Sequence, residues 1–360
     1  MLVDSLDEAQ RPKKNTIVPV LVRLIQQSPG WVRWVATSRP HAKVKAGLEP
    51  VEGGSIELSL HGENQEADVR EYVEKALDLP SLGLYTGVAE FLAPLVPRLE
   101  QATIICKKAK GLFQYAAMAV EKLAEDPDID LDALPAKLED MYFTSIEREY
   151  GEENMEDYYE YAAPKLAMLV SLYDAVSVDM LIAGLRLLSQ LKLLKHKKAL
   201  QFLLRGMCQD RLLTKDHPLV QLRHKSFADF LKDEKKAGVY AVSAGQGHML
   251  LADRCRQVLK VRSESTDLCI EYSLRYFVHH LCYLHEHPYH PKDGSSRPDP
   301  LLEAARVLLD LDWLLDRLFL DKDTQGVVGD MKQVSSLLKA RGGDGYAELM
   351  EMHRRCMCND

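Results

Sequence analysis

Three carboxylate side chains stand close together in the stretch LVDSLDEA, near the start of the sequence. Asp4, Asp7 and Glu8 follow the apolar residues Leu2 and Val3, a pattern typical of a buried strand that delivers acidic groups to a site. Carboxylate oxygens are the ligands that a hard cation such as Mg²⁺ prefers. A solvated acidic loop would show the same pattern, so the cluster alone does not establish a site.

Two further side chains have the chemistry to bind phosphate. Arg39 lies at the end of the stretch WVRWVATSRP, and its planar guanidinium matches phosphate oxygens in a fork. His224 lies in the stretch LRHKSFADFL, and an imidazole can donate a hydrogen bond to phosphate and change its charge near neutral pH. The alternative for His224 is a buried histidine that is hydrogen-bonded to the backbone.

The elements around the acidic cluster follow the order of a parallel α/β sheet. The stretch TIVPVLVRLIQQSPG has apolar residues at helical spacing and ends at the helix-stopping pair Pro29-Gly30. The Val and Trp content of WVRWVATSRP predicts a strand, and SIELSL predicts another after a Gly-Gly turn. Polar residues at the carboxyl ends of such strands face the ligand crevice, and we expect Asp4 and Arg39 at two of these ends.

These residues resemble two motifs of the NACHT-type STAND P-loop NTPases. LVDSLDEA resembles their Walker B segment, and VATSRP resembles their sensor 1 strand. The resemblance implies that Asp4 holds a magnesium-bound water and that Asp7 or Glu8 orients or activates the attacking water. It also implies that Arg39 reads the γ-phosphate, and that ATP or ADP with Mg²⁺ are the cofactors of a complete module.

Three helices are predicted after this layer, similar to the helical domain that packs behind the nucleotide site in the same group. They are HGENQEADVREYVEKAL, opened by Asn64 or a neighbouring acid, KAKGLFQYAAMAVEKLAE and LPAKLEDMYFTSIEREY. The apolar residues of the first helix lie on one face: Val69, Tyr72, Val73, Ala76 and Leu77. Those of the second form a stripe that we interpret as a helix-packing face: Leu112, Phe113, Ala116, Val120 and Leu123.

From Ala163 to Leu231 the pattern changes to three helices followed by the short strands RLLTKD and LVQLRHKS, an order that predicts a winged helix. LRHKSFADFL resembles the segment of STAND winged helices in which a histidine touches the β-phosphate of bound ADP and holds the protein closed. His224 is the matching residue. The preceding helix carries lysines that would suit DNA, although a solvated face is the simpler interpretation: Lys192, Lys195, Lys197 and Lys198.

The phosphate-binding motif GxxxxGK[ST] does not occur in the sequence. In the family this motif lies upstream of Walker B, so we expect the chain to be the C-terminal part of an NTPase module that hydrolyses negligible nucleotide by itself. The apolar helices after residue 235 resemble the stalk that joins STAND switch modules to WD40, ankyrin or similar repeats. No such repeat is visible before Asp360.

Composition restricts the classes of partner. The net charge of −8 gives no general attraction to nucleic acid or anionic membranes. The longest apolar stretch carries Asp174 and Asp179, which would be costly in a bilayer, and we expect no membrane partner. The seven scattered cysteines fit reduced thiols and a cytoplasmic location. The segment HHLCYLHEHPYH is rich in metal ligands, but its spacing matches no closed zinc pattern.

The sequence therefore predicts a mainly α protein in which a remnant of a P-loop NTPase sheet precedes helical domains. We place this remnant at residues 1–62, a helical domain at 63–140, a winged helix at 141–235 and a helical stalk at 236–360. The predicted function is that of a fragment of a signalling switch that closes on ADP and assembles on ATP. Its partners would be further copies or other proteins, bound through repeats outside this chain. Two alternatives remain: a helical protein–protein interaction scaffold without nucleotide, and a winged-helix DNA-binding protein.

Overall fold

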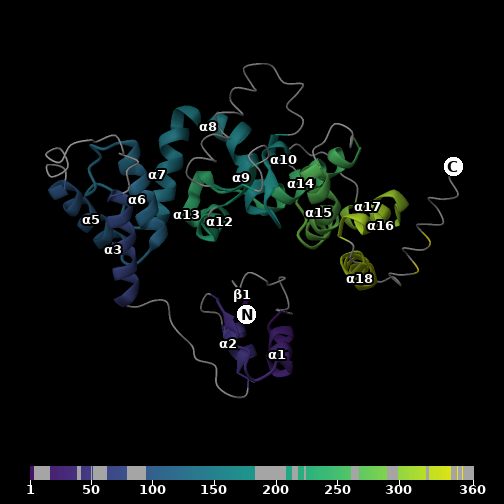
Figure 1. The fold of residues 1–360 in the computed structure, drawn as a ribbon. Helices are drawn as coiled ribbons and strands as arrows, with labels where there is room; N and C mark the ends of the chain where they lie inside the picture. The colour runs from purple at the N-terminus through teal and green to yellow at the C-terminus, as the bar shows by residue number, and fades with distance from the viewer. Residues whose placement is uncertain are drawn as a thin grey trace. The chain divides into compact units, whose positions relative to one another are not determined.

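The computed structural model shows a mainly α-helical protein (Figure 1). It describes residues 1–3, 17–38, 42–49, 51, 63–78, 95–182, 208–212, 218–222, 224–260, 267–289, 299–321, 324–341, 347 and 351. The chain divides into two compact units, Met1–Gln65 and Glu66–Asp360. Among the described residues, no helix combines the length and the apolar character needed to cross a membrane.

The first unit is a small α/β layer. Its described elements are β1 (Leu2–Val3), α1 (Ile17–Gln27), β2 (Val35–Ala36) and α2 (Ala42–Leu48). Strands β1 and β2 pair in parallel, with Leu2 opposite Val35 and Val3 opposite Ala36, which confirms the predicted strand–helix–strand order. Helix α1 ends at Gln27, just before Pro29-Gly30, as the sequence predicts. The SIELSL stretch lies outside the described residues.

Helices α1 and α2 supply the core of the first unit. Val18, Leu21 and Val22 of α1 pack with Val44 of α2. The two helices approach closely, because a Cβ on Gly47 would lie 2.5 Å from Cγ1 of Val18.

The second unit begins with a set of packed helices. They are α3 (Glu63–Asp78), whose first three residues belong to the first unit, α5 (Leu95–Ala109), α6 (Phe113–Glu125) and α7 (Leu138–Tyr150). Val69 and Val73 of α3 are buried, in agreement with the predicted apolar face, whereas Tyr72 is partly exposed and contacts the ring of Phe113. Helix α3 begins at Glu63, so Asn64 lies inside the helix and does not precede it.

The helix predicted across KAKGLFQYAAMAVEKLAE is interrupted near its start. Lys110 and Gly111 both have positive φ angles, of 48° and 80°, and this turn ends α5 and separates it from α6. The predicted packing stripe is correspondingly only partly right. Leu112 and Phe113 are exposed, and the buried face of α6 comprises Tyr115, Ala116, Met118, Ala119 and Leu123.

An irregular helical stretch follows α7. It comprises the 3₁₀ turn η2 (Glu152–Asn154), α8 (Met155–Asp157), the π-helix η3 (Tyr158–Ala162) and α9 (Ala163–Val170). Tyr158 and Tyr161 of the π-helix are buried, while Tyr159 is exposed. The hydroxyl of Tyr158 donates to the carbonyl oxygen of Tyr240 at 2.5 Å, which ties this stretch to a segment 82 residues downstream.

A small antiparallel sheet follows α9. Its described strands are β3 (Val176–Ser177), β4 (Cys208–Leu212) and β5 (Pro218–Leu222), arranged in the order β3-β5-β4. The short helix α10 (Val178–Ile182) comes directly after β3. The sequence predicted β4 and β5 within a few residues, but it did not predict β3.

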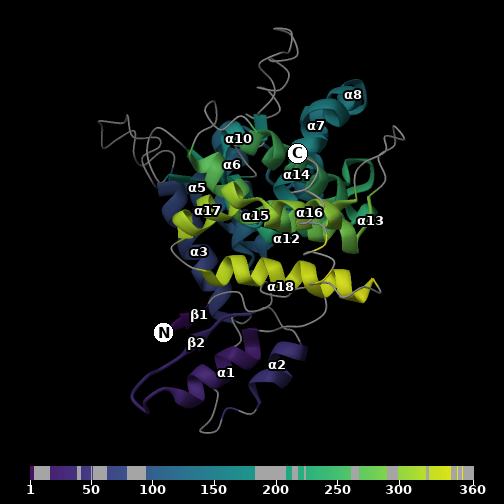
Figure 2. The ribbon, with the colours of Figure 1, turned by 90° about the vertical axis from the view of Figure 1, so that its right-hand side faces the viewer.

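The remaining described elements are helical. They are α12 (Lys225–Lys232), α13 (Glu234–Ala237), the 3₁₀ turn η5 (Gly238–Tyr240), α14 (Ala244–Lys260), α15 (Asp267–Glu286), α16 (Pro300–Leu309), α17 (Leu311–Asp321) and α18 (Thr324–Ala340). Figure 2 shows α15 to α18 in the C-terminal part of this unit. One continuous core runs through the second unit, from Val69 of α3 to Leu338 of α18.

Candidate functional site

The parallel strands of the first unit end on the same side of their pair. The backbone N–H of Thr37 donates to the carbonyl oxygen of Val3 at 2.9 Å, which extends the ladder one step past β2. In the sequence, Asp4 comes directly after β1, and Arg39 follows Thr37 and Ser38. Asp4, Asp7, Glu8 and Arg39 themselves lie outside the described residues, so the predicted catalytic, magnesium and γ-phosphate positions remain predictions.

His224 is the predicted site residue that the structure describes. It lies between β5 and α12, so the strand predicted across LVQLRHKS is too long and His224 does not belong to it. Its backbone is extended, with φ −138° and ψ 137°, and its side chain is exposed. The imidazole makes no capping hydrogen bond to α12, although its backbone carbonyl accepts from the N–H of Phe227. The alternative of a buried histidine at this position is therefore wrong.

Helix α12 is strongly amphipathic, and this fixes how it presents its first turn. Phe227, Phe230 and Leu231 are buried against the core. The ring of Tyr142, on α7, lies 4.9 Å from that of Phe227 and 5.6 Å from that of Phe230, measured between centroids. The HKSF sequence thus directs an exposed imidazole outward and an aromatic anchor inward.

The first turn of α12 has a chemistry that suits an anion. Backbone N–H groups at a helix N-terminus carry a partial positive charge, and the exposed imidazole of His224 adds a hydrogen-bond donor beside them. Lys225 follows directly in the sequence. The described side chains at this turn include no acidic group, so the turn could hold phosphate without charge repulsion from its own residues.

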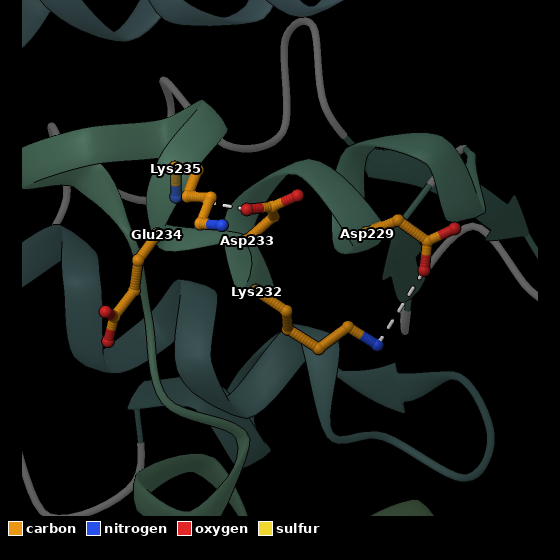
Figure 3. Close-up of a pocket in the computed structure, with 5 residues that line it drawn as sticks. All are labelled: Asp229, Lys232, Asp233, Glu234 and Lys235. Carbon is orange, nitrogen blue, oxygen red and sulfur yellow. Dashed lines mark hydrogen bonds and ion pairs between the residues drawn. The ribbon is translucent and has the colours of Figure 1, made fainter.

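A shallow, solvent-open depression lies at the other end of α12 and over α13 (Figure 3). Its lining residues are all charged: Asp229, Lys232, Asp233, Glu234 and Lys235. Figure 3 shows Lys232 pointing toward Asp229, with 3.9 Å between Nζ and Oδ1, and the Asp233 carboxylate accepts from the backbone N–H of Lys235 at 3.0 Å. Its lining residue nearest in sequence to His224 is Asp229, five residues later or about 7.5 Å along the helix axis at 1.5 Å per residue, and His224 does not line the depression. The depression is therefore separate from the candidate site.

A second group of ring side chains is buried between α14 and α15. His248 and His280 are almost fully buried, and their Nδ1 atoms lie 2.8 Å apart. Nε2 of His280 lies 3.1 Å from the hydroxyl of Tyr272, and the ring of His248 stacks on Tyr283 with 3.7 Å between centroids. In the sequence, His280 stands out only as part of the segment HHLCYLHEHPYH, which is rich in metal ligands, and His248 does not stand out. A usable signal was present, because His280 occupies the apolar face of α15 with Phe277 and Leu284.

Burial controls the charge of this histidine pair. The pKa of His248 is lowered to about 3. Burial is the main cause, and the charges of His287 and Lys232 lower it further. The pKa of His280 lies well below its usual range. Burial is the main cause, and the charges of His248 and His279 lower it further. Both rings are therefore neutral at physiological pH. Within the described part of the chain, no group of three His, Cys, Asp or Glu side chains is arranged to hold a metal ion.

Comparisons with known proteins identify no relative. No protein-family model matches the chain, and neither does any curated protein or solved structure.

Proposed function

We propose that this chain is part of a NACHT-type STAND nucleotide switch, in which His224 contacts the β-phosphate of ADP and holds the closed state. The observation that carries the proposal is the placement of His224: it is exposed, it lies two residues after the end of β5, and it stands at the N-terminus of an anchored helix. This is the position that a phosphate-binding imidazole needs, because the helix N-terminus adds its own attraction for an anion.

The strand arrangement around His224 supports a winged helix. Strand β5 lies between β3 and β4, and both pairings are antiparallel. Strand β3 precedes α10, and β4 and β5 follow the part of the chain for which the sequence predicts a third helix. In a winged helix, one strand precedes the last two helices. This strand pairs with the final strand of the hairpin that follows those helices.

The first unit supports a nucleotide-binding sheet. The parallel pairing of β1 and β2 around α1 brings the ends of both strands to one edge, where Walker B and sensor 1 residues would meet a ligand. In a complete module, Asp4 would hold magnesium-bound water, Asp7 or Glu8 would act on the attacking water, and Arg39 would contact the γ-phosphate.

The test requires a complete module, made by fusing the chain to the P-loop half of a NACHT protein. If His224 contacts ADP and Arg39 contacts the γ-phosphate, the two residues favour opposite states of one equilibrium. His224→Ala should raise the assembled fraction in ADP, because a charge-assisted hydrogen bond worth about 1.5–3 kcal/mol is lost from the closed state. Arg39→Ala should lower the assembled fraction in ATP.

Light scattering in ADP and in ATP measures the particle mass of each variant. His287→Ala, which removes an exposed histidine directly after the end of α15, serves as the matched control and should leave assembly unchanged. If His224→Ala and Arg39→Ala shift assembly in the same direction, or if neither shifts it in a folded protein, the nucleotide switch is wrong.

A protein-binding scaffold without nucleotide is the second candidate. The observation that favours it is an apolar pair on α17, where Leu315 and Phe319 are 44% and 80% exposed and one helical turn apart. A scaffold of this kind predicts that Phe319→Ser weakens partner capture and that His224→Ala has no effect. DNA binding ranks below both, because a solvated face is the simpler interpretation of the lysines that suggested it, and the net charge of −8 gives no general attraction to nucleic acid.

A further inference from the structure

Two hydroxyl groups far apart in the sequence meet beside the candidate site. The hydroxyl of Tyr142, on α7, lies 3.0 Å from Oγ of Ser226, in the first turn of α12. Tyr142 is 1% exposed, and burial raises the pKa of its hydroxyl, which therefore keeps its proton at physiological pH. The contact is a neutral hydrogen bond in a protected setting, two residues after His224.

The ring of Tyr142 and its hydroxyl constrain α12 in different ways. The ring packs on Phe227 and Phe230, which sets the distance between α7 and α12. Packing of aromatic rings tolerates small rotations of a helix about its axis. The hydroxyl bond to Ser226 is directional, so it selects one rotation of the first turn.

A second contact from α7 holds the next helix. Nζ of Lys236, on α13, lies 3.1 Å from Oε1 of Glu139. Glu139 and Tyr142 are three residues apart and therefore lie on the same side of α7. Both side chains of the Lys236–Glu139 pair are about half exposed, so this pair contributes little by itself. The partly buried hydrogen bond of Tyr142 to Ser226 is the specific contact.

We propose that Tyr142 is a positioning residue for His224: through Ser226 it fixes the first turn of α12 and thereby the direction in which the imidazole points. The claim that this direction matters for the contact with ADP rests on the proposed function. The claim that Tyr142 fixes the first turn of α12 does not. A movement of α7 would be passed to His224 through this bond. Ser226 and Phe227 thus hold His224 in place through their contacts with α7.

The first experiment uses the chain as it exists. Tyr142→Phe keeps the ring and removes only the hydroxyl, so amide hydrogen exchange over residues 224–228 should become about 2- to 10-fold faster. Ser226→Ala should produce the same change, and the double variant should add nothing further. Tyr159→Phe is the matched control, since it removes a hydroxyl that donates to the carbonyl of Val239 at 3.1 Å. Unchanged exchange over 224–228 in Tyr142→Phe would overturn the proposal.

The second experiment uses the fusion with a P-loop half and measures the rate of ADP release. Tyr142→Phe should speed release about 2- to 10-fold in the parent and leave it unchanged in a His224→Ala background, because a positioning residue acts only through the residue that it positions. Equal acceleration in both backgrounds overturns the positioning role. If His224→Ala itself does not alter ADP release while exchange still rises in Tyr142→Phe, the proposed function fails and the fixing of the α12 turn stands.

Discussion

The Nδ1 atoms of His248 and His280 lie 2.8 Å apart in the interface between α14 and α15. One of these nitrogens must donate a proton and the other must accept it. If His280 donates, its Nε2 accepts from the hydroxyl of Tyr272; if His248 donates, the roles at Tyr272 reverse. In either arrangement the pair holds a single proton between the two Nδ1 atoms. A second proton there would charge one ring and set two N–H groups against each other, which removes the hydrogen bond.

We expect this pair to make the protein sensitive to acid. Both pKa values are lower in the folded chain than in the unfolded chain, that of His248 falling from 6.5 to about 3. The unfolded state therefore binds more protons across this window, and the free energy of unfolding falls as the pH decreases from about 6.5 toward 3. Each histidine lowers the free energy of unfolding by at most about 1.4 kcal/mol for each unit by which the pH decreases.

Urea unfolding at pH 7, 6, 5 and 4.5 measures this loss. A variant with both histidines replaced, His248→Gln with His280→Leu, should show a shallower pH dependence between pH 6 and 4.5. His285→Gln, on the same helix, is the matched control and should keep the slope of the parent. Identical slopes in the double variant and the parent would show that the buried pair does not control acid stability.

Gly247 should tolerate no side chain. A Cβ at this position would lie 1.9 Å from the carbonyl oxygen of Ala167 and 2.3 Å from Oγ of Ser171, so α9 and α14 would have to separate. We expect Gly247→Ala to lower the free energy of unfolding by about 1–3 kcal/mol. Gly329→Ala is the opposite case, because a Cβ there meets nothing within 4 Å in the interior of α18. The free energy of unfolding of this variant should be higher than that of the parent by about 0.5–1 kcal/mol. Thermal unfolding of both variants tests the contrast, and a stable Gly247→Ala protein would contradict it.

Lys165 should destabilise the protein at neutral pH. It is 3% exposed, and its Nζ donates to the carbonyl oxygen of Tyr161 at 2.7 Å. Burial, and then the charge of Arg254, lowers its pKa to about 8. Lys165→Met keeps an unbranched side chain and removes the ammonium group, so it should raise the free energy of unfolding at pH 7 by about 1–3 kcal/mol.

The pH dependence gives an independent check on Lys165. Between pH 8 and its usual pKa of 10.5, the unfolded chain holds a proton that the folded chain has released. The parent should therefore gain stability as the pH rises from 8 to 9, and Lys165→Met should lack this gain. Urea unfolding at pH 7, 8 and 9 compares the two proteins. A variant that is less stable than the parent at pH 7 would mean that the ammonium contributes favourably.

The isolated chain should bind nucleotide weakly or not at all. Its sequence lacks the GxxxxGK[ST] motif, whose backbone amides and lysine hold the phosphates. We expect calorimetry to detect no saturable ATP or ADP binding at micromolar concentrations. A stoichiometric micromolar site would show that this chain binds nucleotide without the GxxxxGK[ST] motif, and it would make the first turn of α12 a candidate for that site.

The sequence predicts the elements whose signals are local. The end of α1 before Pro29-Gly30 and the parallel strands around that helix follow from side-chain pattern and turn residues. The break between α5 and α6 does not, because it depends on Lys110 adopting a positive φ, which is uncommon for a residue with a Cβ. In the sequence alone, Leu112 and Phe113 continue the apolar face of one longer helix.

The surroundings of the candidate residues depend on contacts between distant segments. The sequence identifies His224, but its anchor Tyr142 lies 82 residues earlier, and no spacing rule connects them. The partner of His280 is 32 residues away on another helix, so a segment that suggested metal ligands proves to contain half of a buried histidine pair. The sequence singles out these residues by type, whereas the contacts that they make follow only from the fold.

The π-helix at Tyr158–Ala162 is a point at which the chain can lose one residue. A π turn accommodates one residue more than the α-helix that it interrupts. Deleting the exposed Glu160 would let η3 relax into an α-helical turn, while the buried faces of α8 and α9 keep their directions. A deletion within α9 would instead turn everything on one side of it by about 100°, because each α-helical residue adds that angle. This segment can therefore lose a residue without a shift of helical phase, and sequences with this fold should vary in length here before they vary in α9.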